Sequence, residues 1–383
     1  MIAQDTIDEF IAGCVRSCLG SDQRPRWPAT FNVCGDEVAT RIVFHGVAGI
    51  LCDDADAMGD WPSEVKGLVA TEARLGALWE ATHNPVIVSA IRALMDAGIE
   101  SVVMKGTALA YSLYEDAALR RRGDSDLLVK PNDLMCAREA LRSAGLAQDT
   151  AQFGPNFQEV WEYESAAGMT HLIDLHWQPV DSPFILKLVD CDQIWSQKVA
   201  LDRLCIGAYV PDPVITLVRG AINEAWHLKY GYYADGPRLT GGHRMIWAVD
   251  YLLLTEKFSA LDWENLSTYC EKTGASPIVL SALEGAETML GMALPDTVRS
   301  RLTQQATPSP QQRYISSFGE LARLRADVFA STDTAMALAV MRCAAFAPRE
   351  HLLRKFPKSD HWPTFALQLR RYAATMTKTI SKG

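Results

Sequence analysis

Apolar residues recur at intervals of three and four positions through much of the chain, the pattern of helices that each bury one face. In the first hundred residues this spacing predicts helices over Thr6–Cys18, Asp36–Leu51, Pro62–Ala81 and Asn84–Ala97. Beyond residue 210 it predicts six more, over Pro213–Leu228, His243–Phe258, Trp263–Thr273, Pro277–Leu290, Gln311–Ala326 and Thr334–Phe346. Both ends of the chain are therefore predicted to be helical.

The pattern changes in the segment between residues 98 and 200. Four short runs with β-branched or aromatic residues predict strands, over Ile99–Met104, Asp124–Val129, Phe157–Tyr163 and Met169–Trp177. Helical spacing returns between the first strands, over Thr107–Tyr114 and Asn132–Ala144. We therefore predict an α+β fold, with an N-terminal helical region at 1–85, a small mixed β-sheet core at 86–200 and a C-terminal helical domain at 201–383.

The bulk composition narrows the class of protein. With 383 residues, 48% of them hydrophobic, the chain can form more than one packed unit. The formal net charge of -9 disfavours general binding to nucleic acid, because affinity for the phosphate backbone needs an excess of Lys and Arg. The acidic N-terminus has no basic segment ahead of an apolar run, and the longest apolar stretch, Met336–Ala347, is interrupted by Arg342. We expect a cytoplasmic protein without membrane partners and with reduced cysteines.

Two acidic residues mark the start of the second predicted strand. Asp124 and Asp126 are two positions apart, so their side chains project from the same face of the strand, whereas Ser125 faces the other way. Neighbouring carboxylates repel each other unless a cation lies between them, and oxygen ligands of this kind suit Mg²⁺ carrying triphosphate oxygens. The pair therefore predicts a metal site at the tip of a strand.

A third acid lies in the last predicted strand of the core. Asp174 is surrounded by apolar residues, and a buried carboxylate needs a partner, which a shared metal would supply. In a regular strand His176 faces the same way as Asp174. His176 is therefore a candidate either to lie near a nucleotide or to orient a carboxylate.

Basic and flexible residues precede the paired acids. Lys105 and Gly106 lie between the first strand and its helix, where free backbone N–H groups favour an anion and glycine allows close approach. Arg120 adds a second cation just before the acids. These residues could hold the phosphates of a nucleotide. The structural alternative is a polar turn at Gly123–Asp126, a hydrogen-bonded structural Asp174 and a structural His176.

These residues also form a set of motifs, namely Val103-Met104-Lys105-Gly106, Leu113-Tyr114, Arg120, Gly123-Asp124-Ser125-Asp126-Leu127-Leu128-Val129 and Asp174-Leu175-His176-Trp177. Together they resemble the uncharacterised nucleotidyltransferase family, a branch of the DNA polymerase β-like nucleotidyltransferases, over residues 86 to 295. The resemblance implies two Mg²⁺ ions, or Mn²⁺, held by the three aspartates. It further implies that the other motif residues bind the NTP, such as ATP: Lys105, Gly106, Arg120, Gly123 and His176. One departure is Lys105-Gly106 itself, which stands where the wider superfamily has Gly-Ser.

The activity implied is the transfer of a nucleoside monophosphate from the NTP to an acceptor, with release of pyrophosphate. Some relatives lie among genes for modified peptides, so the resemblance favours a peptide or small-molecule acceptor. Two other functions stay open at this point: a non-catalytic nucleotide-binding or scaffold protein, and a metal-dependent phosphotransferase or phosphatase using the same site. The released product, pyrophosphate or orthophosphate, separates the enzymatic alternatives. Neither the base of the nucleotide nor the acceptor can be read from the sequence.

Overall fold

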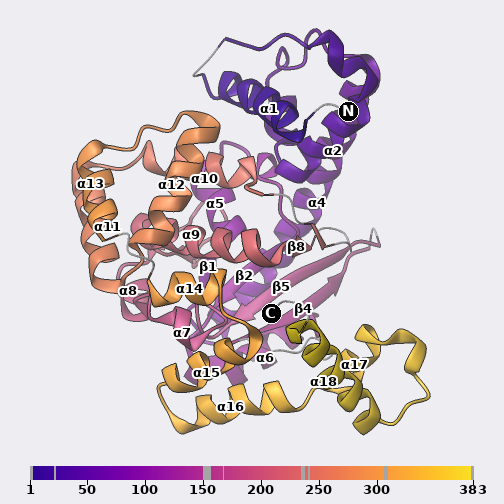
Figure 1. The fold of residues 1–383 in the computed structure, drawn as a ribbon, viewed down its shortest axis with the longest axis vertical. Helices are drawn as coiled ribbons and strands as arrows, with labels where there is room; N and C mark the ends of the chain where they lie inside the picture. Colours follow the sequence, from indigo (N-terminus) through magenta and orange to yellow (C-terminus); the bar gives the residue numbers. More distant parts are fainter. Residues whose placement is uncertain are drawn as a thin grey trace.

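The fold consists of helices arranged around one small β-sheet, as drawn in Figure 1. This computed structural model describes residues 3–20, 23–149, 157–166, 168–233, 238–239, 242–305 and 309–380. The predicted α+β class is confirmed. None of the helices in these ranges is both long and apolar enough to cross a membrane.

The central sheet has five strands in the order β1-β2-β5-β4-β3. Their bounds are β1 Val102–Met104, β2 Asp124–Leu128, β3 Ala147–Gln148, β4 Gln158–Glu164 and β5 Thr170–His176. Strands β2 and β5 are parallel, and all the other pairs are antiparallel. The sheet is therefore mixed, as predicted. Two short ribbons lie outside it, formed by β6 Val199–Ala200 with β7 Tyr209–Val210, and by β8 Tyr232–Tyr233 with β9 Arg238–Leu239.

The two faces of the sheet pack against different helices. Val103, Leu127 and Ile173 lie on one face and share an apolar cluster with the helices α4 Ser63–Asp96 and α6 Leu134–Ser143. Met104 and Leu128 lie on the opposite face, in the cluster that contains most of the remaining helices. Because side chains alternate along a strand, every residue in register with Met104 or Leu128 points to that second face. The acidic residues of β2 and β5 belong to it.

The second face is covered by helices from the C-terminal half of the chain. The longest is α9 Pro213–Tyr230. It is capped by Asp212, whose side chain accepts hydrogen bonds from two backbone N–H groups of the first turn. It packs against α10 Met245–Thr255 and α12 Ser276–Leu290. The neighbouring helices are α5 Lys105–Leu113, α7 Pro183–Leu186, α8 Cys191–Ser196, α11 Ala260–Thr273, α13 Asp296–Gln304 and α14 Pro310–Ser316.

The N-terminal helices are α1 Gln4–Cys18, α2 Gly35–His45 and α3 Ala48–Asp53. They lie at the top of the view in Figure 1. Their buried residues belong to the same apolar cluster as α9, α10 and α12, and α1 contacts α12 directly. The N-terminal helices therefore share one core with α9, α10 and α12. Short 3-10 turns complete this half of the fold, at Ala29–Val33, Ala117–Leu119 and Pro131–Asp133.

The structure divides the helical segments differently from the sequence prediction at three places. Residues 62–97, predicted as two helices, form the single helix α4, which contains Pro85. Burial of Val86, Ile87 and Ile91 in the second apolar cluster stabilises the helix beyond the proline, although Pro85 removes one backbone hydrogen bond. Helix α4 continues through residue 85, the predicted end of the N-terminal region. The proposed division of the chain into regions stays a prediction.

The other two differences are breaks. Asp36–Leu51 is divided into α2 and α3 at Gly46, whose φ of 73° is in the left-handed region that favours glycine. Gln311–Ala326 is divided into α14 and α15, where α15 Glu320–Ala330 begins after Gly319. In both cases the helical spacing continues through a residue that ends or starts a helix.

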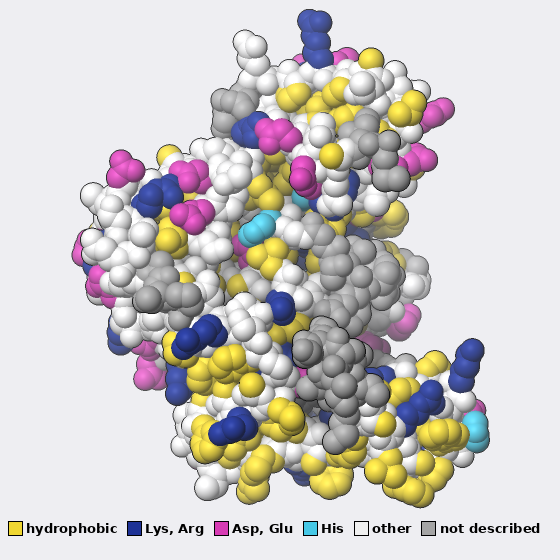
Figure 2. Space-filling model, viewed as in Figure 1, with side chains coloured by type: hydrophobic (Ala, Val, Ile, Leu, Met, Phe, Trp, Pro, Cys, Tyr) yellow, Lys and Arg dark blue, Asp and Glu magenta, His cyan; other side chains and the backbone are white. Residues whose placement is uncertain are grey.

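The last helices, α15, α16 Thr334–Ala345, α17 Arg349–Lys355 and α18 Thr364–Ile380, lie at the lower end of the molecule in Figure 1. Apolar side chains gather on this end in Figure 2. Those with large exposed fractions are Leu321, Phe329, Leu338, Phe346, Phe365 and Leu369. All nine cysteines of the chain are free thiols, in agreement with the prediction.

Candidate active site

Asp126 and Asp174 lie side by side on the two parallel strands. Asp126 of β2 is in register with Asp174 of β5, and both side chains point to the face covered by α9. The residues next to them, Leu127 and Leu175, are fully buried on the opposite face and hold the strands in the core. The alternation predicted within each strand is therefore observed, and the pairing of β2 with β5 brings Asp126 and Asp174 together.

His176 completes a compact group with these two acids. Ligand atoms of Asp126, Asp174 and His176 all lie within 4.8 Å of one another. The Nε2 atom of His176 is 2.8 Å from Oδ1 of Asp126, and Gln158 of β4 donates a hydrogen bond of 3.3 Å to Oδ2 of Asp174. Of the two roles predicted for His176, the contact corresponds to orienting a carboxylate.

Asp124 has a different environment from the other two aspartates. It lies on the same face as Asp126 but at the exposed start of β2, and it does not belong to the compact group. Gly123 precedes it in an open position, where an added Cβ would meet no atom within 4 Å. The predicted roles of Asp124 and Gly123 stay predictions.

Lys105 joins the acidic group from the start of α5. Its φ of 51° makes it the non-glycine residue with a left-handed backbone among the described residues. That conformation is unfavourable for a side chain with a Cβ and is often retained at functional sites. The Nζ atom donates a hydrogen bond of 2.5 Å to Oδ1 of Asp126. Lys105 thus places a positive charge directly on the carboxylate that His176 also contacts.

The environment of the site raises the pKa of two of its aspartates and lowers the pKa of the third. Burial raises the pKa of Asp174 well above its usual range, and the neighbouring Asp124 and Asp126 carboxylates add to the effect. Although Asp124 lies at the exposed start of β2, the protein around its carboxylate removes water, and this effect together with the charge of Asp126 raises the pKa of Asp124 to about 6. Burial would also raise the pKa of Asp126, but Lys105 and the hydrogen bond from His176 outweigh it and lower that pKa. The site therefore carries unrelieved repulsion between carboxylates.

Arg120 is held by a buried ion pair with a residue of α10. Its Nη2 and Nε atoms donate hydrogen bonds of 2.6 and 3.2 Å to the two oxygens of Asp250, and its Nη1 donates to the carbonyl of Arg121. Tyr114 donates a further hydrogen bond to Asp250. The guanidinium passes close to Gly106, where an added Cβ would lie 3.0 Å from Nη1 of Arg120. The structure thus brings Arg120 and Gly106 together, with all three nitrogens of Arg120 already engaged.

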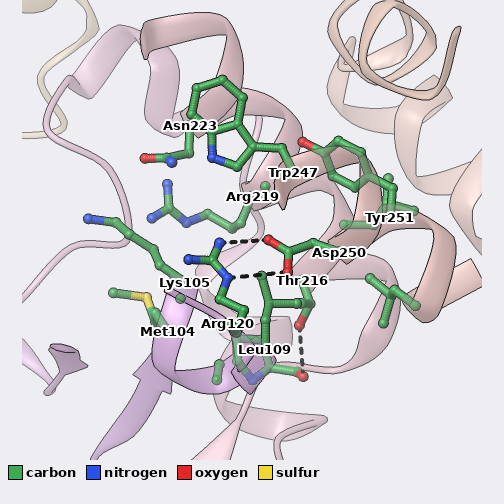
Figure 3. Close-up of a pocket in the computed structure, with 16 residues that line it drawn as sticks. Met104, Lys105, Leu109, Arg120, Thr216, Arg219, Asn223, Trp247, Asp250 and Tyr251 are labelled. Atoms are coloured by element: carbon green, nitrogen blue, oxygen red, sulfur yellow. Dashed lines mark hydrogen bonds and ion pairs between the residues drawn. The ribbon is translucent and has the colours of Figure 1, made fainter. Parts of the chain in front are cut away.

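Two polar residues of α9 enter the site without having been singled out from the sequence. Arg219 and Asn223 line the pocket shown in Figure 3, together with Lys105, and the polar ends of all three lie on the same side of it. The same three residues, with His176, also line a second cavity next to the end of β5. A sequence signal existed, because Arg219 interrupts a run of apolar positions on α9 that are otherwise buried. Nothing local indicated that this helix covers the acidic face.

A polar network supports β2 from the opposite face of the sheet. Ser125, between the two acids, bonds His83 of α4 and Thr107 of α5, each at 2.7 Å. Arg122 donates to Thr107 and forms a buried ion pair with Glu80. Burial, together with the charge of Arg122, lowers the pKa of His83 to about 3, so this histidine is neutral. The network fixes the position of the strand that carries Asp124 and Asp126.

Comparison with known proteins assigns the chain that carries this site to a family. No curated protein and no solved structure matched the chain significantly. The sequence model of a family described as "Uncharacterised nucleotidyltransferase" matches residues 35–291, which is more than half of the chain and includes every residue of the site described above. The resemblance seen in the motifs around Lys105, Asp126 and Asp174 is confirmed by this match. The chain therefore belongs to the uncharacterised nucleotidyltransferase family.

Proposed function

We propose that this protein transfers a nucleoside monophosphate from an NTP to a hydroxyl group of a peptide or small molecule, in a reaction that needs Mg²⁺ or Mn²⁺ and releases pyrophosphate. The observation that carries the proposal is the pairing of Asp126 with Asp174 in register, next to Lys105. Family membership supports the general role of nucleotidyl transfer. The choice of metal and of acceptor is part of the proposal.

The donor set fits a hard divalent cation. Asp126 and Asp174 offer carboxylate oxygens within 4.8 Å of each other, and Asp124 lies two residues earlier on the same face. Carboxylate oxygens are the ligands that Mg²⁺ and Mn²⁺ prefer. Burial raises the pKa of Asp174 and the charges of Asp124 and Asp126 raise it further, and a bound cation would relieve this repulsion between the carboxylates. Once bound, the cation would polarise the α-phosphate and lower the pKa of the attacking hydroxyl.

The protein side chains then have separate tasks. The acceptor oxygen forms a bond to the α-phosphorus while the bond from that phosphorus to the oxygen bridging the β-phosphate breaks. Asp174, as a carboxylate beside the cation, accepts the hydroxyl proton. The electron pair of the broken bond leaves with pyrophosphate, whose charge Lys105 stabilises from the start of α5. His176 holds the carboxylate of Asp126 in position.

The test combines the four NTPs, Mg²⁺ or Mn²⁺ and candidate acceptors, and measures released pyrophosphate together with the mass added to the acceptor or to the protein itself. We expect Asp126→Asn to lose pyrophosphate release by a factor on the order of 100 or more, because the metal supplies several kcal/mol of charge stabilisation. Asp202→Asn, at an exposed position in a turn, is the matched control. Full activity of Asp126→Asn would refute the proposal.

Two other products define the alternatives. Release of orthophosphate, with transfer or hydrolysis of a phosphoryl group, would assign the site to a phosphotransferase or phosphatase. Metal-dependent binding of nucleotide without turnover on any acceptor would assign it to a nucleotide-binding or scaffold role.

A further inference from the structure

Arg219 is a buried cation that has no counter-ion among the described residues. Its residue is 8% exposed, and its Nε atom has no hydrogen-bond partner in the described part of the chain. Within the same residues no carboxylate lies close enough to form an ion pair with it. Buried charges in proteins are normally paired, because leaving one unpaired strongly destabilises the fold. The position of Arg219 is therefore incomplete without an anion.

The free guanidinium points into the site. Arg219 and Asn223 are one helical turn apart on α9, so they project from the same face of the helix. Arg219 and Asn223 line the pocket of Figure 3 and also the second cavity beside His176. Lys105 lines the same two cavities. Two cations and one amide thus converge where the two cavities meet.

The acids nearby do not neutralise this cation. Asp126 and Asp181 act on Arg219 only at a distance, and Asp126 already accepts hydrogen bonds from Lys105 and His176. Arg120 has fewer N–H groups left for a ligand, because three of its five already donate to Asp250 and to a backbone carbonyl. Of the two arginines in this pocket, Arg219 is the one without an ion pair to a carboxylate in the described part of the chain, whereas Arg120 is paired with Asp250.

We propose that Arg219, together with Lys105 and Asn223, binds the two terminal phosphates of the NTP and holds them as pyrophosphate when they leave. A guanidinium presents planar paired donors that match phosphate oxygens, and Lys105 adds a second charge at the start of α5. The inference rests on the proposed nucleotidyl transfer and names the group that receives the leaving charge. The shared chemistry is a phosphate oxyanion, which could also come from a phosphorylated acceptor.

The location of Lys105 favours the nucleotide as the source. Lys105 lies at the beginning of α5, where free backbone N–H groups of the first turn also attract an anion. It reaches Asp126, one of the acids proposed to bind the metal, so phosphates at Lys105 and Arg219 would lie next to that site. The triphosphate of one NTP molecule can contact the metal, Lys105 and Arg219 at the same time.

Binding of pyrophosphate with Mg²⁺ tests the inference without any turnover. Isothermal titration calorimetry should show that Arg219→Met weakens the binding of pyrophosphate and NTP by about 10- to 100-fold, because charge-assisted hydrogen bonds are lost. Binding of the nucleoside monophosphate should be unchanged. Arg92→Met, which removes an exposed arginine of α4, should bind like the wild type, and Arg219→Lys should retain part of the affinity.

Thermal unfolding without ligand separates a binding role from a structural one. If Arg219 awaits an anion, Arg219→Met removes an unpaired buried charge, so its melting temperature should equal or exceed that of the wild type, and pyrophosphate should stabilise it less. A lower melting temperature with unchanged pyrophosphate affinity would overturn the inference. Unchanged affinity for NTP and pyrophosphate with a raised KM for a phosphorylated acceptor would also overturn it and assign the residue to the acceptor.

The two proposals fail in different ways. Pyrophosphate binding that depends on Arg219, without nucleotidyl transfer to any acceptor, would uphold the anion site and reject the proposed function. Nucleotidyl transfer with pyrophosphate binding independent of Arg219 would do the reverse.

Discussion

The Nζ atom of Lys105 lies 2.5 Å from Oδ1 of Asp126, on the carboxylate that is in register with Asp174. Without a metal, the ammonium group is thus the cation nearest to the acids. Burial would lower the pKa of Lys105, but Asp126 outweighs that effect and raises it. A bound metal and a triphosphate would offer Asp126 and Lys105 separate partners, so this ion pair is expected to open when substrate binds.

Lys105→Met should reduce pyrophosphate release by about 100- to 1,000-fold, the usual effect of removing one donor from a charge-stabilising site. The measurement is a single-turnover assay at saturating Mg²⁺. Lys130→Met removes an exposed lysine near the end of the sheet and serves as the control. Equal rates for the Lys105 variant and the wild type would show that Lys105 has no role in the chemical step.

His176→Phe should lower activity by about 10- to 100-fold and weaken the apparent affinity for the metal, because Asp126 loses the group that orients it. The readout is the rate of pyrophosphate release as a function of Mg²⁺ concentration. His176→Gln, which can still donate a hydrogen bond, should recover part of the loss. If both variants have the metal dependence of the wild type, His176 has only a packing role.

Asp250→Ala should destabilise the fold by about 3 to 5 kcal/mol, because it leaves the buried charge of Arg120 without a partner. Tyr114 would lose its hydrogen-bond acceptor in the same change. Urea unfolding at neutral pH gives the free energy of unfolding. The double replacement Arg120→Met with Asp250→Leu should be less destabilised than Asp250→Ala. If the destabilisation of the double variant equals the sum of those of Arg120→Met and Asp250→Leu measured singly, the ion pair contributes nothing of its own.

His243 gives a pH dependence away from the acidic site. A hydrogen bond of 2.6 Å to Glu224 raises the pKa of His243 above its ordinary value of 6.5, while partial burial opposes the shift. A histidine with a raised pKa stabilises the folded state below its unfolded pKa, and this contribution is lost as the pH rises through the folded pKa. Stability should therefore decline from pH 6 toward pH 9.

The variant His243→Gln should lack this decline, which urea unfolding across the same pH range can detect. Tyr251 donates a hydrogen bond to the other oxygen of Glu224, so Tyr251→Phe is the matched change that leaves the histidine in place and should keep the pH dependence. A decline of equal size in the wild type and in His243→Gln would assign it to other groups.

Much of the site follows from local patterns in the sequence. The two-residue period of a strand places Asp124 with Asp126, and Asp174 with His176, on common faces, whichever strands pair in the fold. The order of a strand, Lys105-Gly106 and a helix likewise predicts a cation at the start of that helix, next to a glycine that allows a ligand to come close. These relationships involve residues only a few positions apart, which is why periodicity and turn chemistry were sufficient to predict them.

The tertiary structure decided which of these groups meet. Only the parallel pairing of β2 with β5 brings Asp126 next to Asp174, 48 positions away, and only the packing of α10 gives Arg120 its partner Asp250. Arg219 became a candidate because α9 covers the acidic face and leaves the Nε atom of Arg219 without a hydrogen-bond partner in the described part of the chain. Strand register and helix docking depend on apolar surfaces from distant segments that fit only in the assembled core, and no local pattern records that fit.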